Sequence, residues 1–139
     1  MKQRSSKTKP LQIYVLDSEA LSQAVRGDRR MLTRFKLAAQ REVELVTSPM
    51  TLIEACDGKT TEGRWNWVLS RVRVVAIGKE EARAAHRLLA DAQLHGHEHA
   101  IDAVLAVIAR QLKGEVTILT SDVGDLEKLV PDTTLVRNV

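Results

Sequence analysis

Two aspartates, three residues apart, follow an apolar run near the end of the chain. Residues 116–119 (VTIL) are β-branched and aliphatic, as in a buried strand. Ser121 is suited to cap a helix whose first turn contains Asp122 and Asp125. Residues three apart share a helix face, so both carboxylates are expected at the C-terminal edge of this strand. Open parallel sheets bind their ligands at that edge.

Asp102 is the only polar residue within residues 100–109 (AIDAVLAVIA). Such a segment is typical of a helix buried on nearly all sides, where an unpaired carboxylate is costly. We expect Asp102 in the first or second turn of this helix, at the sheet edge where Asp17 and Asp122 emerge. Glu54 is likewise the only acidic residue of an apolar helix that follows the second predicted strand.

Five carboxylates are therefore expected to converge as catalytic and metal-binding groups: Asp17, Glu54, Asp102, Asp122 and Asp125. Clustered carboxylates repel one another, and their pKa values rise unless positive charge is supplied. Mg²⁺ and Mn²⁺ prefer oxygen ligands and would supply that charge. A site of this kind can activate water and hydrolyse a phosphodiester, with one metal ion or two. The sequence contains no Walker loop, GxGxxG turn or nucleophilic Ser/His/Asp set that would favour other phosphate chemistry.

Each acid also has a purely structural interpretation. Asp17 is suited to cap a helix, and first-turn acids such as Asp122 and Asp125 are favoured by the helix dipole. Glu54 and Asp102 are open to interpretation as paired structural charges. A single shared site explains all five positions at once, so we favour it over five separate coincidences.

Strands are expected to alternate with helices along the whole chain. The predicted strands are residues 11–16, 43–47, 72–77, 116–119 and 134–136, and the predicted helices are a first that Gly27 ends, a second from Asp28, then 50–56, 61–70, 79–94, 99–112 and one after Ser121. This order implies βαβ units with right-handed crossovers. The fold class is therefore α/β, with a mostly parallel sheet covered by helices on both faces.

Length and composition point to one domain with an aliphatic core. Only four of the 139 residues are aromatic (Tyr14, Phe35, Trp65 and Trp67), which favours helices packed on a sheet. The single cysteine, Cys56, cannot form an internal disulfide, and a cytoplasmic location is expected. No apolar run of about 18 residues is present, so no membrane span is expected.

The basic charge is concentrated at the start of the chain. Lys2, Arg4, Lys7 and Lys9 are four of the 21 basic residues, which leaves 17 basic against 18 acidic residues in the remainder. We expect residues 1–10 to form a basic, flexible tail and residues 11–139 to form a single domain. The tail is weak support for nucleic-acid binding, and a disordered solvated arm is the simpler interpretation.

Two of the predicted helices carry side chains with a structural and a functional interpretation. The second helix bears a basic face, either solvated or in contact with a phosphate backbone (Arg29, Arg30, Arg34, Lys36 and Arg41). Trp65 and Trp67 are two apart and cannot share a helix face, so one is expected inside and the other near the surface. A stacking platform for a base is the functional alternative.

Three histidines stand close together in residues 95–99 (HGHEH). A polar loop between two helices is expected, because a structural zinc site normally has four ligands and no cysteine is near. Gly96 argues against an early helix start that would let His95 face His99. His99, one turn before Asp102, is a candidate for contact with a substrate phosphate.

Four segments resemble the signature segments of PIN-domain ribonucleases: residues 15–21 (VLDSEAL), 48–54 (SPMTLIE), 101–106 (IDAVLA) and 119–125 (LTSDVGD). The resemblance covers residues 12–136, and the VapC toxins of type II toxin–antitoxin modules are the most similar type by length. It implies a three-layer α/β/α sandwich and Mg²⁺- or Mn²⁺-dependent endoribonuclease activity on RNA. It also implies a homodimer and a cognate antitoxin whose tail covers the active site.

By this resemblance Asp17, Glu54, Asp102 and Asp122 are the core carboxylates, and Asp125 is the accessory acid of the Thr-x-Asp-x-x-Asp motif. The chain departs from the family pattern twice. Glu19 stands where Ser or Asn is usual, which adds a negative charge, and Leu126 replaces a common aromatic residue, which should affect packing only.

Two other functions remain open at the level of sequence. One is a catalytically silent module that keeps the fold and binds RNA or protein. The other is a receiver-type or phosphatase domain with Asp17 as the phosphoacceptor. The second is disfavoured, because Glu19 occupies the position of the usual second aspartate.

Overall fold

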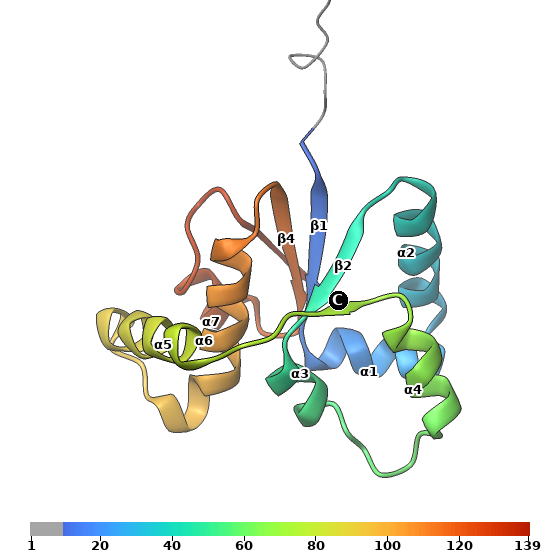
Figure 1. Ribbon diagram of the computed structural model, residues 1–139, viewed down its shortest axis with the longest axis horizontal. Helices are drawn as coiled ribbons and strands as arrows, with labels where there is room; N and C mark the ends of the chain where they lie inside the picture. The colour runs from blue at the N-terminus through green and yellow to red at the C-terminus, as the bar shows by residue number, and fades with distance from the viewer. Residues whose placement is uncertain (1–9) are drawn as a thin grey trace, which may run out of the picture.

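The structure is a computed structural model that describes residues 10–139 (Figure 1). The predicted basic tail, apart from Pro10, lies outside the described residues. In chain order the elements are β1 (Gln12–Leu16), α1 (Ser18–Arg26), α2 (Arg29–Gln40), β2 (Glu44–Thr47), α3 (Pro49–Glu54), α4 (Glu62–Leu69), β3 (Arg73–Val74), α5 (Lys79–Ala92), α6 (Gly96–Gln111), β4 (Glu115–Thr120), α7 (Val123–Glu127) and β5 (Leu135–Asn138). No helix among the described residues is long and apolar enough to cross a bilayer.

The five strands form one parallel sheet in the order β3-β2-β1-β4-β5. The central strand β1 pairs on both sides, with Ile13 opposite Glu44 of β2 and Val116 of β4. Parallel strands all end at the same edge, so the segments that follow β1, β2 and β4 meet there. The predicted parallel sheet is confirmed.

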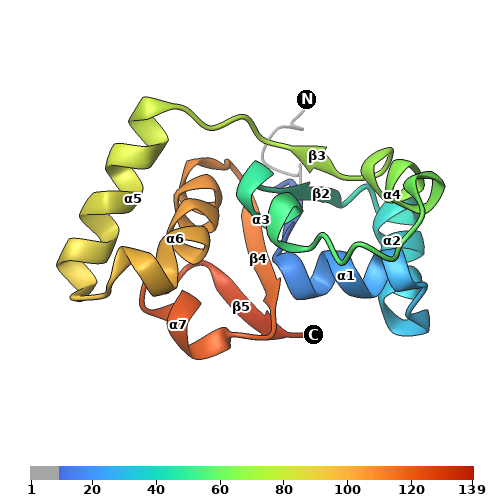
Figure 2. The same ribbon diagram turned by 90° about the horizontal axis from the view of Figure 1, so that it is seen from below.

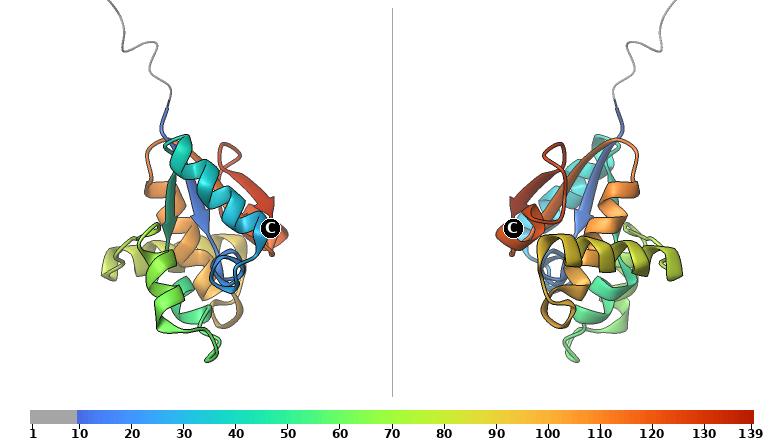
Figure 3. Two further views of the ribbon diagram at one scale, coloured as in Figure 1. Left: turned by 90° about the vertical axis from the view of Figure 1, so that its right-hand side faces the viewer. Right: turned by 90° about the vertical axis from the view of Figure 1, so that its left-hand side faces the viewer.

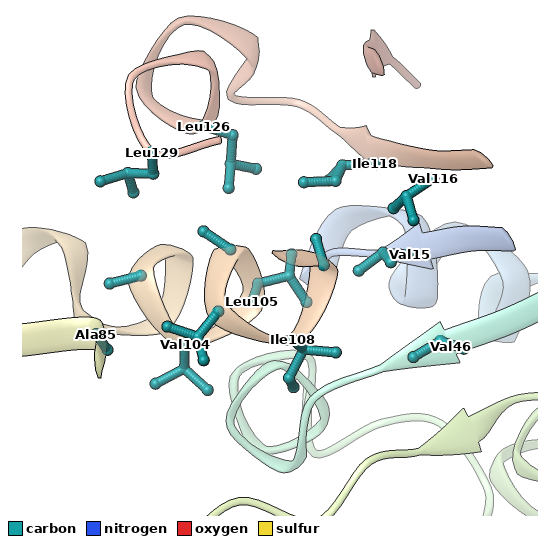
Figure 4. Packing of buried hydrophobic residues seen from close by; sticks show 14 of the residues in the cluster. Val15, Val46, Ala85, Val104, Leu105, Ile108, Val116, Ile118, Leu126 and Leu129 are labelled. Carbon is teal, nitrogen blue, oxygen red and sulfur yellow. The ribbon is translucent and has the colours of Figure 1, made fainter. Parts of the chain in front are cut away.

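Helices cover both faces of the sheet, because successive side chains of each strand point to opposite faces. Val15 and Ile118 pack toward α6 and contribute to one core with Leu105 (Figure 4). Leu16 and Leu119 face the other way, into a second core with α1, α2 and α4. Views from two sides show α2 and α4 on one side of the sheet and α5 and α6 on the other (Figure 3). The predicted three-layer α/β/α sandwich is confirmed.

Several predicted helix ends are confirmed by their caps. At the start of α1 the Asp17 side chain accepts a hydrogen bond from the backbone N–H of Ala20. At the start of α2 the Asp28 side chain accepts one from the backbone N–H of Met31. Gly27 ends α1 in the left-handed conformation, with φ of 83°. Ser48 caps α3, and Pro49 occupies its first position.

The third strand is much shorter than the predicted 72–77. Only Arg73 and Val74 are assigned to β3, opposite the last two residues of β2. The reason is that β2 ends at Thr47, where the chain turns into α3, so residues beyond 75 have no strand to pair with. They cross instead to α5, which packs on the outside of α6 (Figure 2).

Two predicted helix starts are wrong. Helix α6 begins at Gly96 rather than at His99, because α5 already ends at Ala92 and is capped by Gln93, whose φ of 55° is left-handed. Helix α7 is preceded by Asp122 rather than capped by Ser121. The Ser121 residue has a different contact: its backbone N–H donates to the carboxylate of Asp17.

Candidate metal centre

A cavity of about 490 Å³ opens at the C-terminal edge of the sheet, and we call it the acidic cavity. It is lined by Asp17, Ser18, Met50, Glu54, His97, Glu98, Ala100, Ile101, Asp102, Ser121 and Asp122. Its acidic side chains come from the end of β1, the end of α3, the first two turns of α6 and the segment after β4, and they include Glu98, which the sequence analysis did not propose. Four of the five predicted carboxylates therefore line one cavity, as the topology predicts.

Asp17 is the most buried of these acids, with 7% of its surface exposed. Its two carboxylate oxygens accept hydrogen bonds from the N–H of Ala20, at 2.9 Å, and the N–H of Ser121, at 3.1 Å. Burial raises the pKa of Asp17, and these hydrogen bonds, together with one from the Thr120 side chain, oppose that rise. The carboxylate is thus held in a fixed position between the ends of β1 and β4.

Asp102 has the most perturbed acidity of the group. Burial and then the negative charges around it raise its pKa from 3.8 to about 6. Those charges belong, in order of decreasing effect, to Asp122, Asp17, Glu54 and Asp125. Because such repulsion weakens with distance, these effects indicate that the other four predicted carboxylates lie near Asp102.

The positive charge available to this group is small. Asp125 lies 3.8 Å from the Lys128 ammonium and 3.6 Å from the imidazole of His99. Within the described chain, Asp17, Glu54, Asp102 and Asp122 form no ion pair. Burial, followed by the charge of Asp125, raises the pKa of Asp122. The acidic cavity therefore has an excess of negative charge, and its oxygen donors suit a hard divalent cation.

One group at this site was not among the metal ligands expected from the sequence. His99 offers a nitrogen within 4.8 Å of carboxylate oxygens of both Asp102 and Asp125, a grouping that could hold a metal ion. The expected polar loop is wrong, since His97 and His99 lie inside α6. The spacing of His99 and Asp102, three apart on the predicted helix, was the available signal, but the approach of Asp125 to His99 depends on how α7 packs against α6. His95 precedes the helix and does not join the grouping.

The fold is shared with proteins of known structure. No family model matches the chain, and no curated protein matches it. The crystal structure of VapBC2 from Rickettsia felis, bound to a DNA fragment from their promoter, matches 91% of this chain and 98% of that chain at 15% identity, with a TM-score of 0.65. The structure of VapBC-1 from nontypeable Haemophilus influenzae matches 91% of this chain and 97% of that chain at 16% identity, with a TM-score of 0.53. The chain has a PIN-like fold.

The two departures from the family pattern have clear places in this PIN-like fold. Glu19 contacts Gln23 and forms an ion pair with Arg26 at 3.1 Å, along α1, so its charge is compensated on that helix. Leu126 is fully buried in the core beside α6. At this level of identity the likeness concerns the fold, and the chemistry of the PIN-like chain has to be argued from its own side chains.

Proposed function

We propose that this protein is a metal-dependent endoribonuclease that hydrolyses RNA phosphodiester bonds and acts as the toxin of a toxin–antitoxin pair. The observation that carries the proposal is the gathering of four other carboxylates around Asp102, whose pKa is raised to about 6 by burial and then by these charges. Carboxyl groups with strongly shifted pKa values are typical of functional sites, and the C-terminal edge of a parallel sheet is where such sites usually lie.

The donor set fits Mg²⁺ or Mn²⁺. All five predicted acids (Asp17, Glu54, Asp102, Asp122 and Asp125) offer carboxylate oxygens, which these ions prefer, and the uncompensated charge favours a cation over an anion. When bound, such an ion supplies positive charge for a phosphate and an acidified water molecule. RNA phosphates would otherwise be repelled by the acidic cavity.

The side chains have separate roles in this proposal. Asp17 is fixed by two backbone N–H groups, so it positions the centre rather than moving during the reaction. Asp102, with the four other carboxylates around it, is placed to hold the ion. Glu54 extends from α3 into the same cavity and is placed to orient the attacking water.

The test is RNA cleavage by Asp102→Asn and Asp17→Asn proteins. Each exchange keeps the shape of the side chain and removes one negative oxygen, and we expect a fall in the cleavage rate of about 10²–10³-fold or more. Glu19→Gln is the matched control, because Glu19 pairs with Arg26 outside the cavity. Cleavage at the normal rate by both aspartate variants would exclude the proposed chemistry. A silent RNA- or protein-binding module would then be the better description.

An antitoxin partner is part of the same proposal. The matching solved structures are VapBC assemblies, and this chain has an apolar groove of about 490 Å³ between α2 and α4. We call it the Trp67 groove; its lining includes Leu32, Phe35, Ala38, Val43, Leu45, Trp67 and Arg71. Such a surface suits a partner's apolar side chains. Co-expression with the product of an adjacent gene should suppress RNA cleavage, and undiminished cleavage would argue against this partner.

The expected homodimer and the cytoplasmic location also remain part of the proposal. Light scattering on the purified chain, free of any partner, should give twice the 15.5 kDa mass of one chain. A monomer at micromolar concentration would contradict the dimer without affecting the proposed chemistry. Fractionation of the host cells tests the location.

A further inference from the structure

His99 is a buried nitrogen donor without a hydrogen bond. Its side chain is 16% exposed, but its Nδ1 atom is inaccessible to solvent and has no hydrogen-bond partner among the described residues. Buried polar atoms are nearly always paired, and an unpaired one calls for a specific explanation, of which a bound ion is one. The atom faces the Asp125 carboxylate, whose Oδ2 lies 3.6 Å away.

The separation of these two atoms is informative. At 3.6 Å it is too long for a good N–H···O hydrogen bond, whose usual length is about 2.9–3.0 Å. Two ligands of one octahedral ion, each bonded at about 2.1 Å, lie about 3.0 Å apart when adjacent and at most about 4.2 Å apart, a range that includes 3.6 Å. A carboxylate oxygen of Asp102 completes the grouping within 4.8 Å, on the same face of α6 as His99. The distances therefore suit a common metal ion better than a direct hydrogen bond.

We infer that His99 is a nitrogen ligand of the metal centre, together with Asp102 and Asp125, and that it makes the centre prefer Mn²⁺ and other transition metals to Mg²⁺. The inference rests on the proposed function, which it deepens by naming the class of metal. Imidazole suits transition metals, whereas Mg²⁺ prefers oxygen ligands and retains several waters. A centre made only of carboxylates would lack this preference. The bound ion would also join α6 to α7, which carries Asp125.

Mn²⁺ bound to the full chain provides a direct readout that does not depend on RNA. Pulsed electron paramagnetic resonance detects a nitrogen nucleus bonded to Mn²⁺, and calorimetry gives the affinities for Mn²⁺ and Mg²⁺. The normal protein should show one directly bound nitrogen. His99→Gln should lose that signal, and its preference for Mn²⁺ over Mg²⁺ should fall at least about tenfold. His95→Gln is the matched control, because His95 is exposed and outside the grouping.

The outcomes separate the inference from the proposed function. If Mn²⁺ binds without nitrogen coupling, or if His99→Gln keeps the coupling, the inference is overturned; His99 would then be only an ion-pair partner of Asp125. RNA cleavage is measured on the same samples. Cleavage with Mn²⁺ but without a bound nitrogen supports the proposed nuclease function and rejects His99 as a ligand. Bound nitrogen without RNA cleavage supports the ligand and contradicts the nuclease. Unchanged thermal unfolding of metal-free His99→Gln and Asp125→Asn verifies that both variants fold.

Discussion

The acidic cavity and the Trp67 groove have the same volume, about 490 Å³, and opposite chemistry. The acidic cavity lies where parallel strands end and brings carboxylates from four elements together. The Trp67 groove lies between two helices, where Trp67 stacks on Phe35 with ring centroids 6.2 Å apart and Arg71 lies 4.2 Å above the indole. Volume therefore says little about what a surface binds, and the lining decides it.

The two regions also affect stability in opposite directions. Burial raises the pKa values of Asp17, Asp102 and Asp122, and repulsion from neighbouring acids adds to the rise for Asp102 and Asp122. Keeping these groups ionised therefore costs folding free energy. The stacked aromatic pair contributes favourable free energy, although Trp67 remains 42% exposed. A small bound cation would offset the repulsion between carboxylates in the acidic cavity. The Trp67 groove would instead be stabilised by a protein surface that covers the indole.

Removal of divalent ions should have the largest effect and should affect the acidic cavity alone. We expect a chelator to lower RNA cleavage by about 10³-fold, because the carboxylates then repel the phosphate, and added Mn²⁺ to restore it. The Trp67→Ala protein should respond in the same way, since Trp67 does not line that cavity. Cleavage that persists after chelation would contradict a metal centre.

Mn²⁺ should also stabilise the folded chain. At a free concentration one hundred times its Kd, binding to the folded state alone adds about 2.7 kcal/mol to the free energy of unfolding. Denaturant unfolding with and without Mn²⁺ measures this change. A gain in Asp102→Asn equal to that of the normal chain would place the ion elsewhere, whereas Trp67→Ala should keep the full gain.

Asp102→Asn should stabilise the metal-free chain at neutral pH. The folded-state pKa of Asp102, about 6, lies above its ordinary value of 3.8, so the folded state binds the proton more tightly. Its contribution is fully present below about pH 4 and is lost as the pH rises through 6. The variant should therefore be more stable by about 1–2 kcal/mol at pH 7, after allowance for solvent screening, and equal near pH 3. Chelated samples unfolded at both pH values test this, with Glu19→Gln as control.

Trp67→Ala should have the smallest effect of the set. It removes the stacking on Phe35 and the contact with Arg71, for an expected loss of about 1 kcal/mol in the free energy of unfolding. Leu37→Ala, at a partly exposed position of α2, is a suitable control. A loss above about 3 kcal/mol would mean that Trp67 is part of the core rather than a surface for a partner.

Much of the fold and of the candidate site followed from local sequence. The helix starts at Asp17 and Asp28 were identified from residue type and position, because each cap uses hydrogen bonds within its own turn. The gathering of Asp17, Glu54, Asp102 and Asp122 also followed, because parallel strands end at one edge and each acid was tied to a predicted element. The expectation that one tryptophan packs inward and the other lies near the surface was confirmed, with Trp65 half-buried against a core and Trp67 exposed.

Other features depend on contacts between segments remote in sequence, and only the tertiary structure decided them. The length of β3 depends on where β2 ends, and the contact of Ser121 with Asp17 joins residues 104 positions apart. The place of His99 depends on the start of α6 and on α7, which brings Asp125 opposite its Nδ1. The sequence by itself determined which acids meet at the sheet edge, since the strand rule requires no side-chain detail. The nitrogen among those oxygens was decided by the packing of one helix against another.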